Sequence, residues 1–282
     1  MRVPPVIPAA TVVLLRDPPA GHTTGFEVFL VKRPARASFM PHAHVFPGGR
    51  VDTHDREPAW RDRVDGLEAF VHRAREGAED ELAHGVAAIR ELFEEAGVLL
   101  ACDATGHLVS HATALSAART AVHDGTAAFL DVCRSHGWRL ALDRLRPWSR
   151  WVTPAFEPKR FDARFYVACW SGEGDASHDG RETVASDWMT PAEAIARSER
   201  GEHLLGLPTL RTLFELARFD SPAAAAAATA GRPLDPIDPL IYERDDERWL
   251  VLPGDPDYPR PVSFAVEPPT RYRLDAARWK PA

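Results

Sequence analysis

Three glutamates, Glu91, Glu94 and Glu95, are spaced i, i+3 and i+4 along the chain. On a helix, which turns by about 100° per residue, their carboxylates fall within one arc of about 100°. The apolar residues of the same segment fall on the opposite side and are expected to face the core: Val86, Ile89 and Phe93. Carboxylates this close repel one another unless a positive charge neutralises them. A divalent cation that prefers hard oxygen ligands is the natural partner, so the spacing predicts metal-dependent chemistry.

Glutamates on a helix more often form a solvated face, and this alternative has to be weighed. The run Arg-Glu-x-x-Glu-Glu-x-Gly, from Arg90 to Gly97, specifies five residues, which chance supplies on the order of 10⁻⁴ times per chain. A Phe-Pro-Gly-Gly turn that ends at Gly48 and Gly49 precedes it. Its glycines would let a phosphate-bearing ligand approach the backbone closely. The two features together favour a metal and phosphate site over a solvated face.

Apolar patterning and turn residues predict the elements that must hold these residues in place. Strands are predicted at residues 9–15, 26–31 and 161–170, with a strand stub and glycine turn at 45–50 and a final hairpin at 240–242 and 249–252. Helices are predicted at residues 86–97, 111–136 (one helix or a pair), 191–197 and 209–219. The highly charged residues 52–82 predict an inserted helical excursion. Strands and helices follow one another without a regular βαβ rhythm, which favours an α+β or mixed-sheet sandwich over a Rossmann sheet.

Composition limits the class of protein. The 282 residues are 45% hydrophobic and 27% charged, which is typical of a soluble globular protein. A net charge of -7 argues against a nucleic-acid partner, because proteins that grip phosphates are normally basic. No apolar run approaches the ~20 residues needed to span a bilayer, and the amino end does not resemble a signal peptide, so a cytoplasmic enzyme without a membrane partner is expected. The three cysteines, Cys102, Cys133 and Cys169, are predicted to be free thiols.

The segment Arg90–Val98 resembles the second half of the Nudix box, whose pattern is G-x5-E-x7-R-E-U-x-E-E-x-G-U, with U aliphatic. Residues 45–49 resemble the strand and double glycine that open this box. Gly49 and Arg90 are 41 positions apart, about 27 more than the pattern allows, so an insertion lies inside the box. The position of the first glutamate of the pattern holds Leu82, and the adjacent Glu81 is expected to point elsewhere on a helix.

The inserted box is similar to the Nudix branch that includes the peroxisomal acyl-coenzyme A diphosphatases. Further segments carry this resemblance: residues 36–49, 87–100, 147–154, 160–162 and 188–193. It implies hydrolysis of a diphosphate linkage in coenzyme A or acyl-coenzyme A, giving 3′,5′-ADP and (acyl-)4′-phosphopantetheine. ADP-ribose, NADH and dinucleoside polyphosphates are alternative substrates. A non-catalytic Nudix module that senses a nucleotide is a further alternative, favoured only by the missing first glutamate.

The resemblance also implies roles for individual residues. Glu91, Glu94 and Glu95 would hold Mg²⁺ or Mn²⁺, and Arg90 would brace the loop and a carboxylate instead of touching the substrate. The segment before residues 188–191 often brings an additional acid to the metals in similar proteins, and Glu182 is the candidate here, although an exposed loop glutamate is almost as good an interpretation. Any of these carboxylates could take the proton from the attacking water.

Other residues admit a binding interpretation beside a structural one. Lys159 and Arg160 precede a strand and are candidates to bind a substrate phosphate, such as the 3′-phosphate of coenzyme A, or else form a solvated strand entrance. Trp148, Trp151 and Phe156 could stack on an adenine, although aromatic residues at this density more often belong to the core. His42 and His44 would share one face of a strand, but the third and fourth ligands that zinc requires are not found nearby.

The expected fold is therefore a Nudix α/β/α sandwich with a central mixed sheet. Residues 1–235 are predicted to form the hydrolase domain, with the insertion at about 52–82, and residues 236–282 a carboxyl-terminal extension packed on the same domain. The insertion and residues 111–136 are expected either to cap the site or to form the surface of a homodimer.

Overall fold

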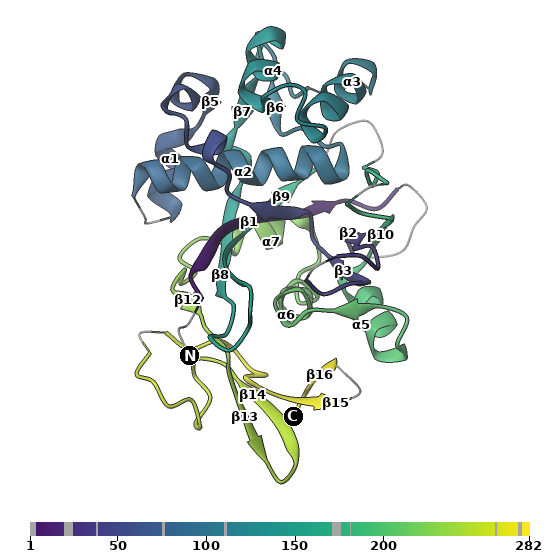
Figure 1. The fold of residues 1–282 in the computed structure, drawn as a ribbon, viewed down its shortest axis with the longest axis vertical. Helices are drawn as coiled ribbons and strands as arrows, with labels where there is room; N and C mark the ends of the chain where they lie inside the picture. Colours follow the sequence, from purple (N-terminus) through teal and green to yellow (C-terminus); the bar gives the residue numbers. More distant parts are fainter. Residues whose placement is uncertain are drawn as a thin grey trace.

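The structure is a computed structural model that describes residues 4–19, 25–37, 39–74, 77–109, 112–170, 176–180, 182–262, 264–275 and 278–282. Figure 1 shows three layers, with a central sheet between two groups of helices. A smaller sheet made by the carboxyl-terminal residues lies at the lower end of this view.

The central sheet has nine strands of mixed direction. Its main path runs in the order β11 (Leu204–Leu205), β3 (Ala43–Val45), β2 (Glu27–Lys32), β1 (Val6–Arg16), β9 (Arg160–Cys169), β8 (Arg146–Val152) and β12 (Pro236–Ile237). In addition, β10 (Ala185–Met189) pairs with β2, and β4 (Gly48–Arg50) pairs with β1. The long strands β1 and β9 run parallel, whereas β2 is antiparallel to β1 and β8 is antiparallel to β9. The mixed sheet predicted from the sequence is thus confirmed.

One face of the sheet is covered by helices of the insertion, of the box and of the segment that follows the box. These elements are η1 (Thr53–Arg56), η2 (Pro58–Arg63), α1 (Leu67–Ala74), α2 (Ala78–Ala96), α3 (Ala112–His123), α4 (Phe129–His136) and η3 (Leu142–Arg144). A three-stranded sheet of β5 (Val64–Asp65), β7 (Arg139–Ala141) and β6 (Ala101–Cys102) joins them. Residues 111–136 thus contain two helices, one of the two alternatives left open by the sequence.

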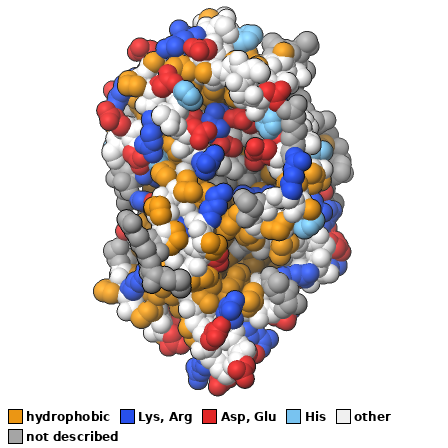
Figure 2. All heavy atoms as spheres, in the orientation of Figure 1, with side chains coloured by type: hydrophobic (Ala, Val, Ile, Leu, Met, Phe, Trp, Pro, Cys, Tyr) orange, Lys and Arg blue, Asp and Glu red, His pale blue; other side chains and the backbone are white. Residues whose placement is uncertain are grey.

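The other face is covered by α5 (Pro191–Arg200), α6 (Leu207–Leu216) and α7 (Pro222–Ala227) (Figure 1). Toward the carboxyl end, β13 (Leu240–Arg244), β14 (Glu247–Val251), β15 (Arg271–Asp275) and β16 (Arg278–Pro281) form an antiparallel sheet. The hairpin predicted at residues 240–252 is therefore followed by two more strands. In the space-filling view of Figure 2, hydrophobic side chains gather in the middle and lower part of the visible face.

Strand β1 divides the core in two because its side chains alternate between the faces of the sheet. Val12 and Leu14 belong to the core under α2, and Val13 and Leu15 belong to the core under α6. The predicted half-buried strand, β9, is buried on both faces over residues 165–168, since helices cover both sides of the sheet. The predicted α/β/α sandwich is confirmed by this arrangement.

Helix α2 is longer than the helix predicted at residues 86–97, because it already begins at Ala78. Its first turn contains Glu79, Asp80 and Glu81, and acidic side chains there interact favourably with the positive end of the helix dipole. It ends at Gly97, whose left-handed φ of 71° suits glycine and whose N–H donates to the Phe93 carbonyl. Among the described residues, no helix is long and apolar enough to cross a membrane.

Candidate functional site

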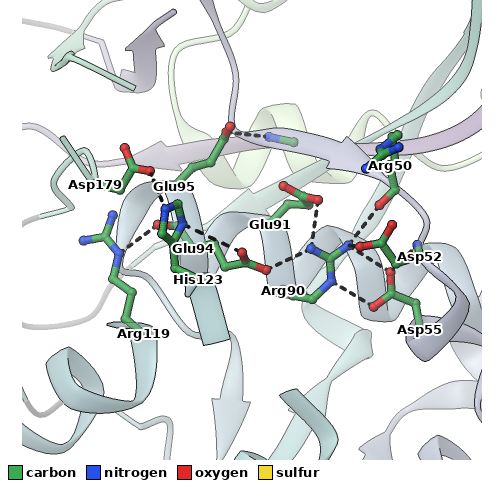
Figure 3. Close-up of polar contacts among 11 residues, drawn as sticks. Arg50, Asp52, Asp55, Arg90, Glu91, Glu94, Glu95, Arg119, His123 and Asp179 are labelled. Atoms are coloured by element: carbon green, nitrogen blue, oxygen red, sulfur yellow. Dashed lines mark hydrogen bonds and ion pairs between the residues drawn. The ribbon is translucent and has the colours of Figure 1, made fainter. Parts of the chain in front are cut away.

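The carboxyl-terminal half of α2 carries the three glutamates that the sequence singled out. Figure 3 shows them along α2, next to Arg90 and to the segment that contains Arg50, Asp52 and Asp55. Glu95 is buried, and the side chains of Glu91 and Glu94 are only 12% and 16% exposed. Helical spacing and the packing of α2 against β1 and β4 together place the three carboxylates beside the glycine turn.

Arg90 lies at the centre of a network that connects this helix to the box insertion (Figure 3). Its guanidinium donates to both carboxylate oxygens of Asp55, each at 2.9 Å, and to the Arg50 carbonyl at 2.9 Å. It also donates to Glu91 at 2.9 Å and to Glu94 at 2.8 Å. Burial by itself lowers the pKa of Arg90, but the hydrogen bond with Asp55 and the charge of Glu91 outweigh burial and raise it. The side chain is thus a permanent cation held by carboxylates and by the loop backbone.

The two glycines allow the turn to lie directly against the glutamates. The Gly48 N–H donates to Glu95 Oε2 at 2.9 Å. A Cβ atom on Gly49 would lie 2.5 Å from the carboxylate of Glu91, closer than real side-chain contacts come. The candidate binding residues Gly48 and Gly49 therefore lie at the glutamate cluster, and their lack of a side chain is what permits the contact.

Two of the three carboxylates are costly to ionise where they lie. Burial, together with the charge of Glu94, raises the pKa of Glu91 to about 7 against the opposing charge of Arg90. Burial raises the pKa of Glu95 well above its usual range, and the charge of Glu91 adds to this effect. The negative charge is undercompensated by the protein, and the donors are all hard oxygens. These residues therefore suit a divalent cation.

In this structure the three carboxylates do not converge on one point. Glu91 and Glu94 are both turned toward the Arg90 guanidinium, and Glu95 is turned toward the Gly48 N–H. Within the described part of the chain, no three His, Cys, Asp or Glu side chains are arranged to hold a metal ion. Glu91 and Glu94 would have to turn away from Arg90 to share a cation with Glu95.

A loop on the other side of the cluster carries Glu182. Its backbone N–H donates to Asp179 Oδ2 at 3.0 Å, while its side chain is exposed. Its charge is close enough to raise the pKa values of Glu91 and Glu95, although it is not the largest cause for either. The structure thus brings Glu182 to the border of the site that the three helix glutamates form.

Several residues at the site were not singled out from the sequence. Arg33 is a half-buried cation whose guanidinium donates to the Phe39 carbonyl at 2.9 Å. Its partial burial lowers its pKa, against the charges of Glu95 and Glu182. Asp55, His123 and Asp179 also border the cluster (Figure 3). Arginine, aspartate and histidine residues occur throughout the chain, so the sequence does not single these out. Only their contacts with residues distant in sequence show that they belong to the site.

Lys159 and Arg160 do not lie at the cluster. In the sheet, Arg160 is level with Val6, whereas Gly49 is level with Ala10, four residues or about 13 Å further along the strand. The Arg160 guanidinium donates to the backbone carbonyls of Thr153 and Pro4. The structure therefore gives no support to phosphate binding by this pair and favours the alternative, a strand entrance.

The other candidate residues make contacts away from the glutamate cluster or lie exposed. Trp148 and Trp151 are buried in the core, whereas Phe156 is 60% exposed. His44 stacks on His203, with ring centroids 3.7 Å apart. Glu81 is buried against β9 and forms an ion pair with Arg164, so it points away from the cluster as predicted. The three cysteines are free.

Comparisons with known proteins agree with this geometry. The family model described as the NUDT19 Nudix domain matches residues 4–79 and 68–219. The acyl-coenzyme A diphosphatase NUDT19 of Gallus gallus is 30% identical over 284 residues, covering 86% of this chain and 75% of that protein. The Homo sapiens protein of the same name is 29% identical, with coverage of 86% and 74%. A solved Nudix hydrolase from Alicyclobacillus acidocaldarius is 26% identical with a TM-score of 0.67, covering 81% of this chain and 99% of that one.

Proposed function

The chain belongs to the Nudix hydrolases, in the family of the NUDT19 Nudix domain, and from this premise we propose that it hydrolyses the diphosphate linkage of coenzyme A or acyl-coenzyme A. The products would be 3′,5′-ADP and (acyl-)4′-phosphopantetheine. Relatives named acyl-coenzyme A diphosphatase, at 29% and 30% identity over most of both chains, support this substrate class.

The observation that carries the proposal is the cluster of Glu91, Glu94 and Glu95, in which Glu95 accepts from the Gly48 N–H and Glu91 fills the space beside Gly49. Carboxylates that are this buried and incompletely compensated are what a divalent cation requires of a protein, and the cation in turn would hold a diphosphate. Glu91, Glu94 and Glu95 would hold Mg²⁺ or Mn²⁺. Such ions, when bound, neutralise charge that develops on the phosphoryl oxygens and lower the pKa of a bound water.

The residues of the chain orient the reaction and move its proton. A water oxygen attacks one phosphorus in line, and the bond from that phosphorus to the bridging oxygen breaks. A carboxylate takes the proton of the water, and Glu182 is our candidate because it borders the helix glutamates and its side chain is exposed to solvent. Arg90 braces the box through Asp55 and the Arg50 carbonyl, and it need not touch the substrate. Its contacts with Glu91 and Glu94 would be given up when these carboxylates turn to a cation.

The test is a hydrolysis screen with Mg²⁺ and with Mn²⁺ against coenzyme A, acetyl-coenzyme A, NADH, ADP-ribose and diadenosine polyphosphates. Glu94→Gln should abolish turnover, because it removes one charge of the cluster. Glu79→Gln is the matched control, since this glutamate lies on the same helix with its side chain 94% exposed. Products identified by chromatography should be 3′,5′-ADP and 4′-phosphopantetheine.

Other outcomes of the screen separate the alternatives. Preferred cleavage of NADH, ADP-ribose or a dinucleoside polyphosphate would keep the diphosphatase and remove coenzyme A as its substrate. Nucleotide binding without cleavage in either metal would instead favour the sensing module. A cytoplasmic location, a homodimer and a domain boundary at residue 235 stay predictions, and light scattering of the purified chain tests the homodimer.

A further inference from the structure

Helix α3, which is outside the Nudix motif, presents two side chains to the glutamate cluster. Arg119 and His123 are four residues apart, so they project from the same face of the helix. Figure 3 shows both side chains directed toward the last turns of α2, with His123 between Glu94 and Asp179. This face therefore lies where the helix glutamates meet the loop that carries Glu182.

The Arg119 side chain connects α3 to the backbone of α2 and to the backbone of the loop that begins near Ser177. Its Nε donates to the Glu94 carbonyl at 2.8 Å, and its guanidinium also donates to the Ser177 carbonyl at 2.8 Å. The Ser177 N–H in turn donates to the Ala96 carbonyl at 2.9 Å. The end of α2, the face of α3 and the beginning of the loop are thus held together independently of any carboxylate.

Asp179 organises the part of the loop that carries Glu182. Its Oδ1 accepts from the Thr183 N–H at 2.8 Å and from the Thr183 hydroxyl at 2.7 Å, and its Oδ2 accepts from the Glu182 N–H at 3.0 Å. Its side chain is only 5% exposed. The position of this one carboxylate therefore determines where the backbone of Glu182 lies.

His123 lies between the carboxylate that organises the loop and a carboxylate of the helix cluster. Its Nδ1 is 3.9 Å from Glu94 Oε2, and its Nε2 is 3.7 Å from Asp179 Oδ2. The ring is 13% exposed, so solvent screens these contacts little. Without the imidazole, two carboxylates would face one another across the space it fills, and their repulsion would move the loop or turn Glu94.

We propose that His123 is a positioning residue, which holds Asp179 and through it Glu182 at a fixed distance from Glu94. This inference rests on the proposed function for its catalytic consequence. Its structural part stands on the contacts alone. It assigns to α3 the task of fixing the loop acid against the metal-binding helix.

The test combines His123→Phe, His123→Gln and Glu182→Gln with the double variant His123→Phe/Glu182→Gln. Steady-state kinetics with the substrate found in the screen should show kcat of His123→Phe lowered about ten- to a hundredfold, with KM changed much less. His123→Gln, which keeps polar atoms at this position, should recover part of the loss. In the Glu182→Gln background, His123→Phe should lower kcat less than about twofold further, because both changes act through one group. His72→Gln, an exposed histidine of α1, is the control and should match the wild type.

Hydrogen exchange of the Glu182 and Thr183 amides provides a readout that needs no activity. Asp179 holds both amides, so His123→Phe should accelerate their exchange about tenfold, while His72→Gln should not. Additive losses in the double variant, or unchanged exchange in His123→Phe, would overturn the proposal. An inactive wild type would instead refute the proposed function, and the exchange rates would then decide the positioning role alone.

Discussion

Gly49 illustrates how the site depends on single atoms. Strand β4 passes so close to α2 that the carboxylate of Glu91 occupies the space where a Cβ atom of residue 49 would lie. The neighbouring Gly48 donates its N–H to Glu95. Two successive backbone positions are thus in direct contact with two of the three glutamates, and any side chain at Gly49 must displace one of them.

We expect Gly49→Ala to lower kcat/KM about ten- to a hundredfold, because a shift of Glu91 by about 1 Å misplaces one carboxylate of the cluster. Gly77→Ala is the matched control, since a Cβ there meets nothing within 4 Å among the described residues and its φ is -65°. The measurement is steady-state hydrolysis together with a thermal melt. Equal activity of Gly49→Ala and the wild type would show that turnover does not depend on the space that Gly49 leaves for the Glu91 carboxylate.

At the scale of elements, the box is assembled by an ion pair between α2 and η1. Arg90 and Asp55 are 35 residues apart in sequence, yet they form two hydrogen bonds of 2.9 Å, and Asp55 is only 2% exposed. The short helix η1, at the start of the inserted segment, therefore packs against α2 and supplies the carboxylate that neutralises Arg90. The pair thus joins the start of the insertion to α2, so the box is closed at this point although the insertion lies between the two residues.

Arg90→Met should destabilise the protein by about 3–5 kcal/mol, because it leaves Asp55 buried and without its cationic partner. In an Asp55→Asn background the same change should cost clearly less, since that charge is already gone. Chemical denaturation measures both free energies of unfolding. Arg134→Met is the control: its pair with Asp131 is exposed, so a change within about 1 kcal/mol is expected. Similar costs for the two arginine variants would contradict the buried pair.

At the scale of the whole molecule, the carboxyl-terminal sheet shares a core with the central sheet. Leu250, Leu252 and Tyr272 belong to the same buried cluster as Val13 of β1 and Leu213 of α6. The Arg211 guanidinium of α6 also donates to the Glu267 carbonyl at 2.5 Å. Residues on both sides of position 235 therefore contribute to one apolar interior, which favours cooperative unfolding.

We expect the full chain to unfold in a single transition, and Leu250→Ala to lower the free energy of unfolding of the whole molecule by about 2–5 kcal/mol. Calorimetry and far-ultraviolet circular dichroism should report the same shifted midpoint. Val262→Ala, at an exposed position, should change the free energy by no more than about 0.5 kcal/mol. Two separate transitions would show that residues 236–282 form an independent unit.

Acid should destabilise the folded chain through His84, which is buried where α2 packs on the sheet. Burial, and then the charge of Arg164, lower the pKa of His84 to about 4. The unfolded chain binds a proton near pH 6.5 and the folded chain does not, so stability is full above pH 6.5 and falls as the pH decreases toward 4. The loss through this residue is at most about 3 kcal/mol.

His84→Gln should lose less stability than the wild type between pH 6.5 and 4, and His72→Gln should lose the same amount as the wild type. Parallel curves for the wild type and His84→Gln would refute this role.

The sequence by itself determined the features that depend on local order. Helical spacing placed Glu91, Glu94 and Glu95 on one side of α2, and the Phe-Pro-Gly-Gly run predicted a glycine turn that a ligand can approach closely. Apolar runs located β1, β2 and β9, because strand and helix periods are properties of neighbouring residues. The motif at residues 90–98 predicted the Nudix family, and the comparisons confirm it.

Only the tertiary structure decided which distant residues meet. Asp55 reaches Arg90 across the insertion, and His123 and Asp179 come together at Glu94 from two further segments. Arg160 lies four strand residues from the level of Gly49 because β1 and β9 are parallel in a register that no local pattern encodes. Such contacts depend on how elements pack on both faces of the sheet, and packing is a property of the folded chain as a whole.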